Sequence, residues 1–183
     1  MLPLTIVIPD MWDEEKEEFI LGSRRTIQLE HSLVSLSKWE AKWHKPFLSK
    51  TQKNAEETTD YIRCMTLTQN VDPELYNYLT SENIKEVNAY IKNPMTATWF
   101  SEDKNKIKGK NSGEQITNEL IYYWMISLNI PLECQKWHLN RLLTLIRVCN
   151  VKNQPPKKMS KKETISRYAA INAARRKQYN SKG

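Results

Sequence analysis

Hydrophobic and polar positions change their spacing along this chain, and the change separates a short β region from a longer helical one. Residues 2–8 are apolar and rich in β-branched side chains, which is typical of a strand. Residues 19–21 and 26–29 have the same character and lie on either side of Gly22-Ser23, which predicts a hairpin. We therefore expect a small antiparallel sheet within about residues 2–30.

From Ser32 onward the apolar positions recur at helical spacing. Leu33, Leu36 and Trp39 lie three residues apart, Trp43 follows four residues later, and Ser32 is a suitable N-cap. We expect this helix to end before Pro46. The same reasoning predicts three further helices in this half of the chain, beginning at Asn54, at Asp72-Pro73 and at Ser81, with Pro94 ending the last.

The second half of the body predicts one β-prone segment and two strong helices. Residues 95–100 favour a strand, and residues 101–112 favour a solvated loop. A capping box at Ser112-Gly-Glu-Gln115 predicts a helix that runs through Ser127, and a second helix, central to the core, is predicted from Pro131 to Cys149. A linker follows at residues 153–156. After it, a second capping box at Ser160-Lys-Lys-Glu163 predicts a helix over residues 161–178.

These elements predict a mainly α fold. We expect a helical bundle with a small N-terminal antiparallel β-hairpin and a basic C-terminal helical tail. The predicted boundaries are residues 1–153 for the body and 154–183 for the linker and tail.

Charge separates the tail from the body. Residues 152–183 contain ten Lys and Arg against one Glu, a net charge of +9, whereas the whole chain carries +7, so residues 1–151 carry −2. Such a tail suits an acidic protein partner, a nucleic acid or an acidic surface of the chain itself. A protein partner is favoured, because Tyr168 and Tyr179 are the only aromatic residues available in the tail for stacking on bases.

Reactive groups are few, and each has a simpler structural explanation. Cys134 and His138 are four residues apart, but no second pair completes a zinc site, so a packed thiol and a hydrogen-bonded imidazole are favoured. His31-Ser32 has no glycine-rich oxyanion turn beside it, and the acidic residues at positions 10–18 lack calcium-loop spacing. His44 is interpreted as a helix-end cation. We expect no enzyme activity, no metal and no cofactor.

Three cysteines, Cys64, Cys134 and Cys149, are widely spaced, and we expect reduced, buried thiols in a cytosolic protein. The start of the chain predicts no signal peptide, and no apolar run predicts a membrane span.

Three blocks of the chain resemble tail assembly chaperones of long-tailed, siphovirus-type bacteriophages. They are residues 27–40 (IQLEHSLVSLSKWE), residues 123–131 (YWMISLNIP) continuing into 137–143 (WHLNRLL), and residues 172–183 (NAARRKQYNSKG). The resemblance covers most of the chain, but it consists of sequence blocks without a residue motif for binding.

The resemblance implies a mainly helical, non-enzymatic protein of the host cell cytoplasm that is absent from the mature virion. It implies binding to the tape measure protein, which the chaperone keeps soluble while the tail tube assembles, and often a longer form made by frameshifting. The tail tube protein and other copies of this chain are further candidate partners, and nucleic acid is a less favoured one.

A chaperone of this kind needs exposed aromatic or apolar surface together with charges that keep the complex soluble. The candidate partner-binding residues are Trp39, Trp43, Trp99, Lys157, Lys158, Lys161, Lys162, Arg167, Arg175, Arg176 and Lys177. For the three tryptophans, core packing is the stronger expectation. Two alternative functions remain open: a nucleic-acid-binding accessory protein that uses the basic tail, and a structural virion component of the neck or tail.

Overall fold

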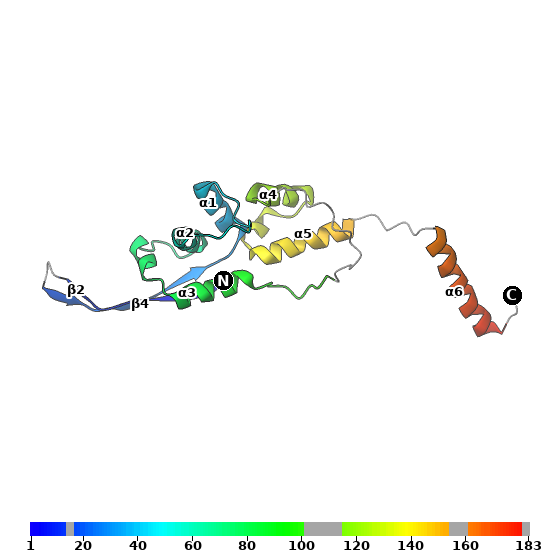
Figure 1. The fold of residues 1–183 in the computed structure, drawn as a ribbon, viewed down its shortest axis with the longest axis horizontal. Coiled ribbons are helices and arrows are strands. Elements are labelled where there is room, and N and C mark those ends of the chain that lie inside the picture. Colours follow the sequence, from blue (N-terminus) through cyan, green and yellow to red (C-terminus); the bar gives the residue numbers. More distant parts are fainter. Residues whose placement is uncertain (14–16, 101–114, 154–160, 181–183) are drawn as a thin grey trace. The chain divides into compact units, whose positions relative to one another are not determined.

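The computed structural model describes residues 1–13, 17–100, 115–153 and 161–180 of the chain (Figure 1). It is mainly α, with an N-terminal antiparallel β-hairpin and a C-terminal helix, so the predicted fold class is confirmed. The chain divides into two compact units, Met1–Asn150 and Val151–Gly183. Each unit is described separately below.

The hairpin contains two short sheets in succession. β1 (Leu2–Ile8) pairs with β4 (Ser23–Leu29), and β2 (Met11–Asp13) pairs with β3 (Glu18–Ile20), in both cases antiparallel. Side chains alternate between the two faces of β1 and β4. The residues buried on the inner face are Leu4, Ile6, Ile27 and Leu29.

The predicted turn at Gly22-Ser23 is wrong. β2 pairs with β3 and β1 pairs with β4, so the four strands form one long hairpin. Gly22 lies between β3 and β4, which run in the same direction along one arm of this hairpin, and so the chain does not reverse there. Gly22 lies where the two sheets meet, its N–H donates to Asp10 Oδ1 at 2.6 Å, and a Cβ at this position would lie 2.4 Å from the Ile8 carbonyl oxygen. The glycine therefore allows a close approach of two backbones.

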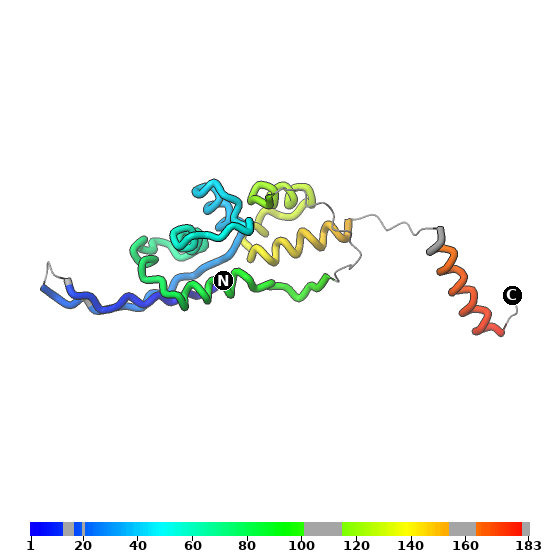
Figure 2. Tube along the Cα trace, in the orientation of Figure 1, coloured from blue at the N-terminus to red at the C-terminus, as the bar shows by residue number. Residues whose placement is uncertain are grey.

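Helices form the rest of the first unit (Figure 2). Their bounds are α1 Leu33–Trp43, α2 Ala55–Met65, the 3₁₀ helix η1 Pro73–Tyr78, α3 Ser81–Lys92, α4 Asn118–Ser127, the 3₁₀ helix η2 Leu132–Lys136 and α5 Leu139–Asn153.

The predicted starts of the first three of these helices are confirmed. Ser32, Asn54 and Asp72 are their N-caps, and each side-chain oxygen accepts a hydrogen bond from a backbone N–H of the first turn. The cap of α3 is Thr80, one residue before the predicted Ser81. His44 lies at the end of α1 with φ 52°, so it is the C-cap residue of that helix.

Three predictions in the second half of the body are wrong. Residues 95–100 form no strand, although their composition is β-prone. α4 begins at Asn118 with Thr117 as its N-cap, and not at the predicted capping box, of which residues 112–114 lie outside the described residues. The single helix predicted from Pro131 is divided into η2 and α5 at Trp137-His138.

The core lies between the inner face of the hairpin and the surrounding helices. α3 lies alongside β1, and α1 packs against α2, α4 and η2 (Figure 1). α5 contributes Leu139, Leu142 and Ile146 to this core, which confirms that it is central.

The second unit contains α6, Lys161–Tyr179, so the predicted tail helix is confirmed. The predicted linker beyond residue 153, the predicted cap Ser160 and the predicted loop at 101–112 lie outside the described residues.

Candidate functional site

Glu40 is a buried carboxylate that joins three separate parts of the first unit. Its Oε1 accepts a hydrogen bond from the backbone N–H of Phe47 at 2.7 Å. Its Oε2 accepts from the backbone N–H and from the side-chain amide of Asn118, each at 2.7 Å. This carboxylate therefore positions the first turn of α4 against α1.

Two more buried carboxylates link α2 to the end of α1. Glu57 accepts from the ammonium group of Lys45 at 2.5 Å, and this bond contributes most to holding the pKa of the Glu57 carboxyl below its ordinary value. Asp60 accepts from the Lys42 ammonium at 2.5 Å and from the indole N–H of Trp43 at 2.9 Å. These two carboxylates hold the end of α1 against α2.

His31 and His138 lie together in the core, with ring centroids 5.1 Å apart. His31 Nδ1 is 2.5 Å from the hydroxyl oxygen of Tyr61, and His138 Nε2 donates to the Tyr90 carbonyl at 3.1 Å. Burial, aided by His138, lowers the pKa of His31 to about 3, and burial also lowers the pKa of His138. Both imidazoles are neutral near pH 7 and enclosed by protein, so they serve packing.

The residue pairs considered for metal binding or catalysis do not form a site. Cys134 lies in η2 and His138 lies beyond its end, so the two residues do not share one helix, although their four-residue spacing is that of neighbours on a helix face. The Ser32 hydroxyl is bonded to Ser35, at 2.8 Å between the two hydroxyl oxygens. Within the described ranges, no group of three His, Cys, Asp or Glu residues is arranged to hold a metal ion.

The three cysteines are free thiols. Cys134 is buried, whereas Cys64 and Cys149 are only half-buried, so the prediction of burial holds fully for Cys134 alone. Burial raises the pKa of the Cys64 thiol, which favours the less reactive protonated form.

The three candidate tryptophans have different surroundings. Trp39 is 1% exposed, and its indole N–H donates to the Glu57 carbonyl at 2.9 Å, so it is a core residue and offers no surface to a partner. Trp43 is half-buried and stacks on Trp39 with ring centroids 6.2 Å apart. Trp99 is 93% exposed. Only Trp99 is positioned to insert its whole ring into a partner.

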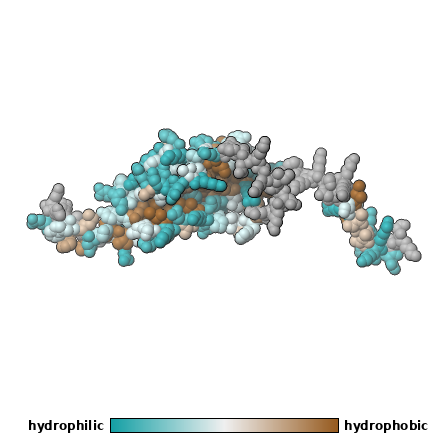
Figure 3. Space-filling view, viewed as in Figure 1, coloured by the Kyte–Doolittle hydropathy of each residue, from teal (hydrophilic) through white to brown (hydrophobic). Residues whose placement is uncertain are grey.

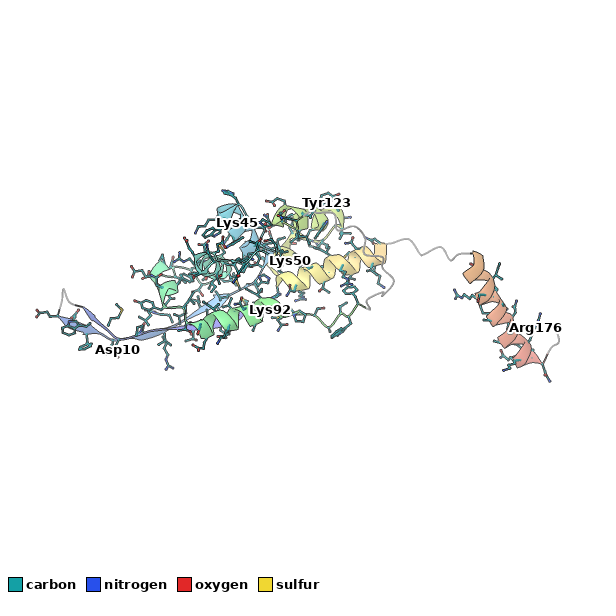
Figure 4. All side chains as sticks on the ribbon, in the orientation of Figure 1. Asp10, Lys45, Lys50, Lys92, Tyr123 and Arg176 are labelled. Carbon is teal, nitrogen blue, oxygen red and sulfur yellow. The ribbon has the colours of Figure 1, made fainter. Side chains whose placement is uncertain are left out.

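The candidate cations of the tail fall into three groups. Lys157 and Lys158 lie outside the described residues, and Lys161, Lys162 and Arg167 belong to the first half of α6. Arg175, Arg176 and Lys177 are exposed near its C-terminus (Figure 4 labels Arg176). Three consecutive residues point about 100° apart around a helix, so this basic cluster surrounds the helix end.

Large apolar side chains are also exposed on α6. Ile165 is 69% exposed, Tyr168 is 63% exposed and Tyr179 is 73% exposed. α6 therefore exposes large apolar side chains among its cations, and the described residues of the second unit contain no core of their own.

α4 has an exposed apolar side, none of whose residues is among the candidate partner-binding residues predicted from the sequence. Ile121 and Met125 are buried in the core, whereas Tyr123 is 63% and Ile126 is 67% exposed. Figure 4 labels Tyr123 on α4. Tyr123 and Ile126 are three residues apart and share one side of the helix. We call this pair the α4 surface.

The tip of the hairpin is a second exposed apolar region. The rings of Trp12 and Phe19 meet edge to face across β2 and β3 with centroids 4.8 Å apart, and Phe19 is 70% exposed. Apolar and polar residues mix along this end of the first unit (Figure 3). The Tyr78 hydroxyl, 3.2 Å from Met11 Sδ, links this tip to η1.

A signal for the α4 surface exists in the sequence. Residues 120–126 are apolar on all sides of the helix, whereas a helix packed on one side only is polar on the other. A helix of this kind in a small unit needs either a complete protein surround or a partner.

Among the described helices, none has both the length and the apolar character needed to cross a bilayer. Comparisons with protein-family models, with curated proteins and with solved structures found no match for this chain.

Proposed function

We propose that this protein is a tail assembly chaperone that binds the tape measure protein of a long-tailed bacteriophage and keeps it soluble until the tail tube assembles. The proposal rests on the resemblance of three sequence blocks, one of which contains both residues of the α4 surface. In this role the protein acts without catalysis in the cytoplasm of the host cell and is absent from the mature virion.

The observation that carries the proposal is the exposure of Tyr123 and Ile126 on a helix whose other side is fixed in the core. Asn118 is held by Glu40 at the start of α4, so the surface is presented by a fixed helix. A long helical client exposes apolar stripes of its own, and burying them against such a surface is favourable by about 25 cal/mol per Å².

Charge supports the same role. The tail of residues 152–183 carries +9, and a complex that keeps such a charge in solvent resists aggregation. The tail also offers a contact for acidic stretches of the client or for the acidic hairpin of another copy of this chain.

The test is co-expression of the full chain with the tape measure protein of the same genome. We expect soluble tape measure protein that co-purifies with the chain, and a Y123E/I126E double variant that folds but loses at least tenfold of this recovery, because two carboxylates would be buried against the client.

The matched control is K38E/A41E, which places two carboxylates at the same spacing on exposed positions of α1. It should recover as much client as the unchanged chain. If all three proteins recover the same amount of soluble tape measure protein, the α4 surface is not the binding site. If the tape measure protein is insoluble in every case, the protein is not its chaperone.

A second candidate function is supported by the composition of α6. Tyr168 and Tyr179 are exposed on a helix that also carries Arg175 and Arg176, and aromatic rings beside cations suit single-stranded nucleic acid. A gel shift with a single-stranded oligonucleotide that weakens with salt and disappears on removal of residues 154–183 would favour this function. Mass spectrometry of purified virions distinguishes these two functions from a structural role. Only a structural component of the neck or tail would be abundant in the virion.

A further inference from the structure

The tip of the hairpin is strongly acidic. Residues 11–20 contain five Asp and Glu against one Lys, a net charge of −4. The helix that contacts the tip, η1, contains Glu74 and no Lys or Arg. Arg24 and Arg25 lie on the same arm of the hairpin, six or more residues beyond Glu18, which is about 20 Å of extended strand. That separation exceeds the Debye length of about 8 Å at physiological salt, so these arginines do not neutralise the tip.

Two acidic residues are register partners at the end of this tip. Asp13 pairs with Glu18 across β2 and β3. Like charges directly opposite each other on neighbouring strands destabilise the pair. Glu17, which precedes β3 and adopts φ 51°, adds another exposed carboxylate beside them. A positively charged partner at this end would relieve the repulsion and stabilise the tip.

One face of the tip adds an apolar contact. Trp12 and Phe19 are register partners, and their rings meet on this face with 50% and 70% of their surfaces exposed. Glu18 follows the opposite face of the strand, because neighbouring residues alternate. The tip is a single layer of two strands, so a partner on the ring face still lies within about one Debye length of the acidic charge.

α6 has the complementary composition. It contains six Lys and Arg against one Glu, a net charge of +5. Ile165, Tyr168 and Tyr179 are between 63% and 73% exposed. At about 100° per residue, these three positions and Arg176 fall within about 80° of each other around the helix. One side of α6 therefore presents large apolar side chains together with a guanidinium group.

We propose that the tip of the hairpin of one copy binds α6 of another copy of this chain. Ile165 and Tyr168 pack against the rings of Trp12 and Phe19, and the cations of α6 lie beside the carboxylates of the tip. Charge selects this occupant: −4 on the tip meets +5 on α6, whereas two tips or two α6 helices would bring like charges together.

The contact is heterologous, because its two surfaces differ. A copy whose tip is occupied still offers its α6, so further copies can join the assembly until it closes into a ring or extends as a filament. This self-association goes beyond the proposed function and needs no client, so it is tested without the tape measure protein.

The first measurement is sedimentation equilibrium of the full chain, purified free of nucleic acid. We expect the average mass to rise with protein concentration at low salt. At about 1 M salt, where the Debye length is about 3 Å, self-association should weaken at least tenfold, because much of the attraction is between exposed charges.

Two variants test the two surfaces separately. E17K/E18K removes the net charge of the tip, and R175E/R176E lowers the net charge of α6 to +1. Each variant alone should self-associate at least tenfold more weakly than the unchanged chain. An equal mixture should pair as tightly as the unchanged chain and stop at a heterodimer, because it contains one intact tip and one intact α6 per pair.

The matched control is E82K/E86K, which makes the same change of charge at exposed positions of α3 and should self-associate like the unchanged chain. A chain that stays monomeric at every concentration, a mixture of the two variants that does not pair, or a control as weak as the tip variant would each overturn the proposal. Association that requires added single-stranded nucleic acid would assign α6 to nucleic acid and would also contradict it.

Discussion

The first unit buries charged residues, whereas the helix of the second unit exposes apolar ones. Glu40 and Glu57 lie inside the first unit with donors on their carboxylate oxygens, and no buried side-chain N or O atom of the described residues lacks a partner. α6, by contrast, exposes Ile165 and Tyr168. The difference teaches that paired polar groups inside the first unit help to specify its fold, whereas the exposed apolar side chains of α6 are suited to contact a partner.

The largest difference in unfolding free energy is expected between substitutions of a buried and an exposed tryptophan. Trp39→Ala removes a buried ring and should lower the free energy of unfolding by about 3–5 kcal/mol. Trp99→Ala, at a 93% exposed position, should change it by less than about 0.5 kcal/mol. Urea unfolding of both variants measures the difference, and similar losses would contradict the burial assigned to Trp39.

A smaller loss is expected when the buried carboxylate of Glu40 is removed. Glu40→Ala leaves the Phe47 N–H and two Asn118 donors without their acceptor, which should cost about 2–3 kcal/mol of unfolding free energy. Glu86→Ala on the exposed side of α3 is the control and should cost less than about 0.5 kcal/mol. Thermal or urea unfolding that shows no difference between them would refute the role of Glu40.

Acid should destabilise the first unit through its buried histidines. The pKa of His31 is about 3 in the folded chain and about 6.5 when unfolded, so only the unfolded state binds this proton between those pH values. The contribution of His31 to the free energy of unfolding is therefore fully present above about pH 6.5. It falls as the pH decreases toward 3, by up to about 1.4 kcal/mol per pH unit.

Urea midpoints at pH 7 and pH 5 measure this loss. His31→Gln should reduce the pH dependence of the unfolding free energy. An equal pH dependence in this variant and in the unchanged chain would show that His31 is not responsible.

The smallest effect on stability is expected from removal of residues 154–183. All core residues of the described ranges lie within the first unit, so its unfolding free energy should change by less than about 0.5 kcal/mol. Client binding, in contrast, should lose part of its salt dependence, because the removed segment contains nine Lys and Arg against one Glu, a net charge of +8. A large drop in the unfolding midpoint of the truncated chain would contradict the separation of the two units.

Local signals in the sequence predict local structure well in this chain. Ser32 and Asn54 were identifiable as caps because a cap needs only a side-chain oxygen and the next few backbone N–H groups. The apolar spacing of α5 likewise identifies Leu139, Leu142 and Ile146 as core residues.

The errors arise where distant residues decide the structure. α4 starts at Asn118 because Glu40, 78 residues earlier, accepts its hydrogen bonds. The helix predicted from Pro131 divides at His138, which bonds to the Tyr90 carbonyl 48 residues earlier and forms a bridge with Ser32. No local pattern contains these contacts, so the sequence does not place the start of α4. The apolar run at residues 120–126 signals an exposed apolar side but does not show which of its residues face solvent.

Hydrogen exchange of the chain in complex with the tape measure protein tests the central claim most directly. The account predicts slower amide exchange along α4 between Glu119 and Ser127 on binding, with the amides around Trp39 unchanged. A stable complex in which α4 exchanges as fast as in the free chain would contradict the claim that this exposed helix side holds the client.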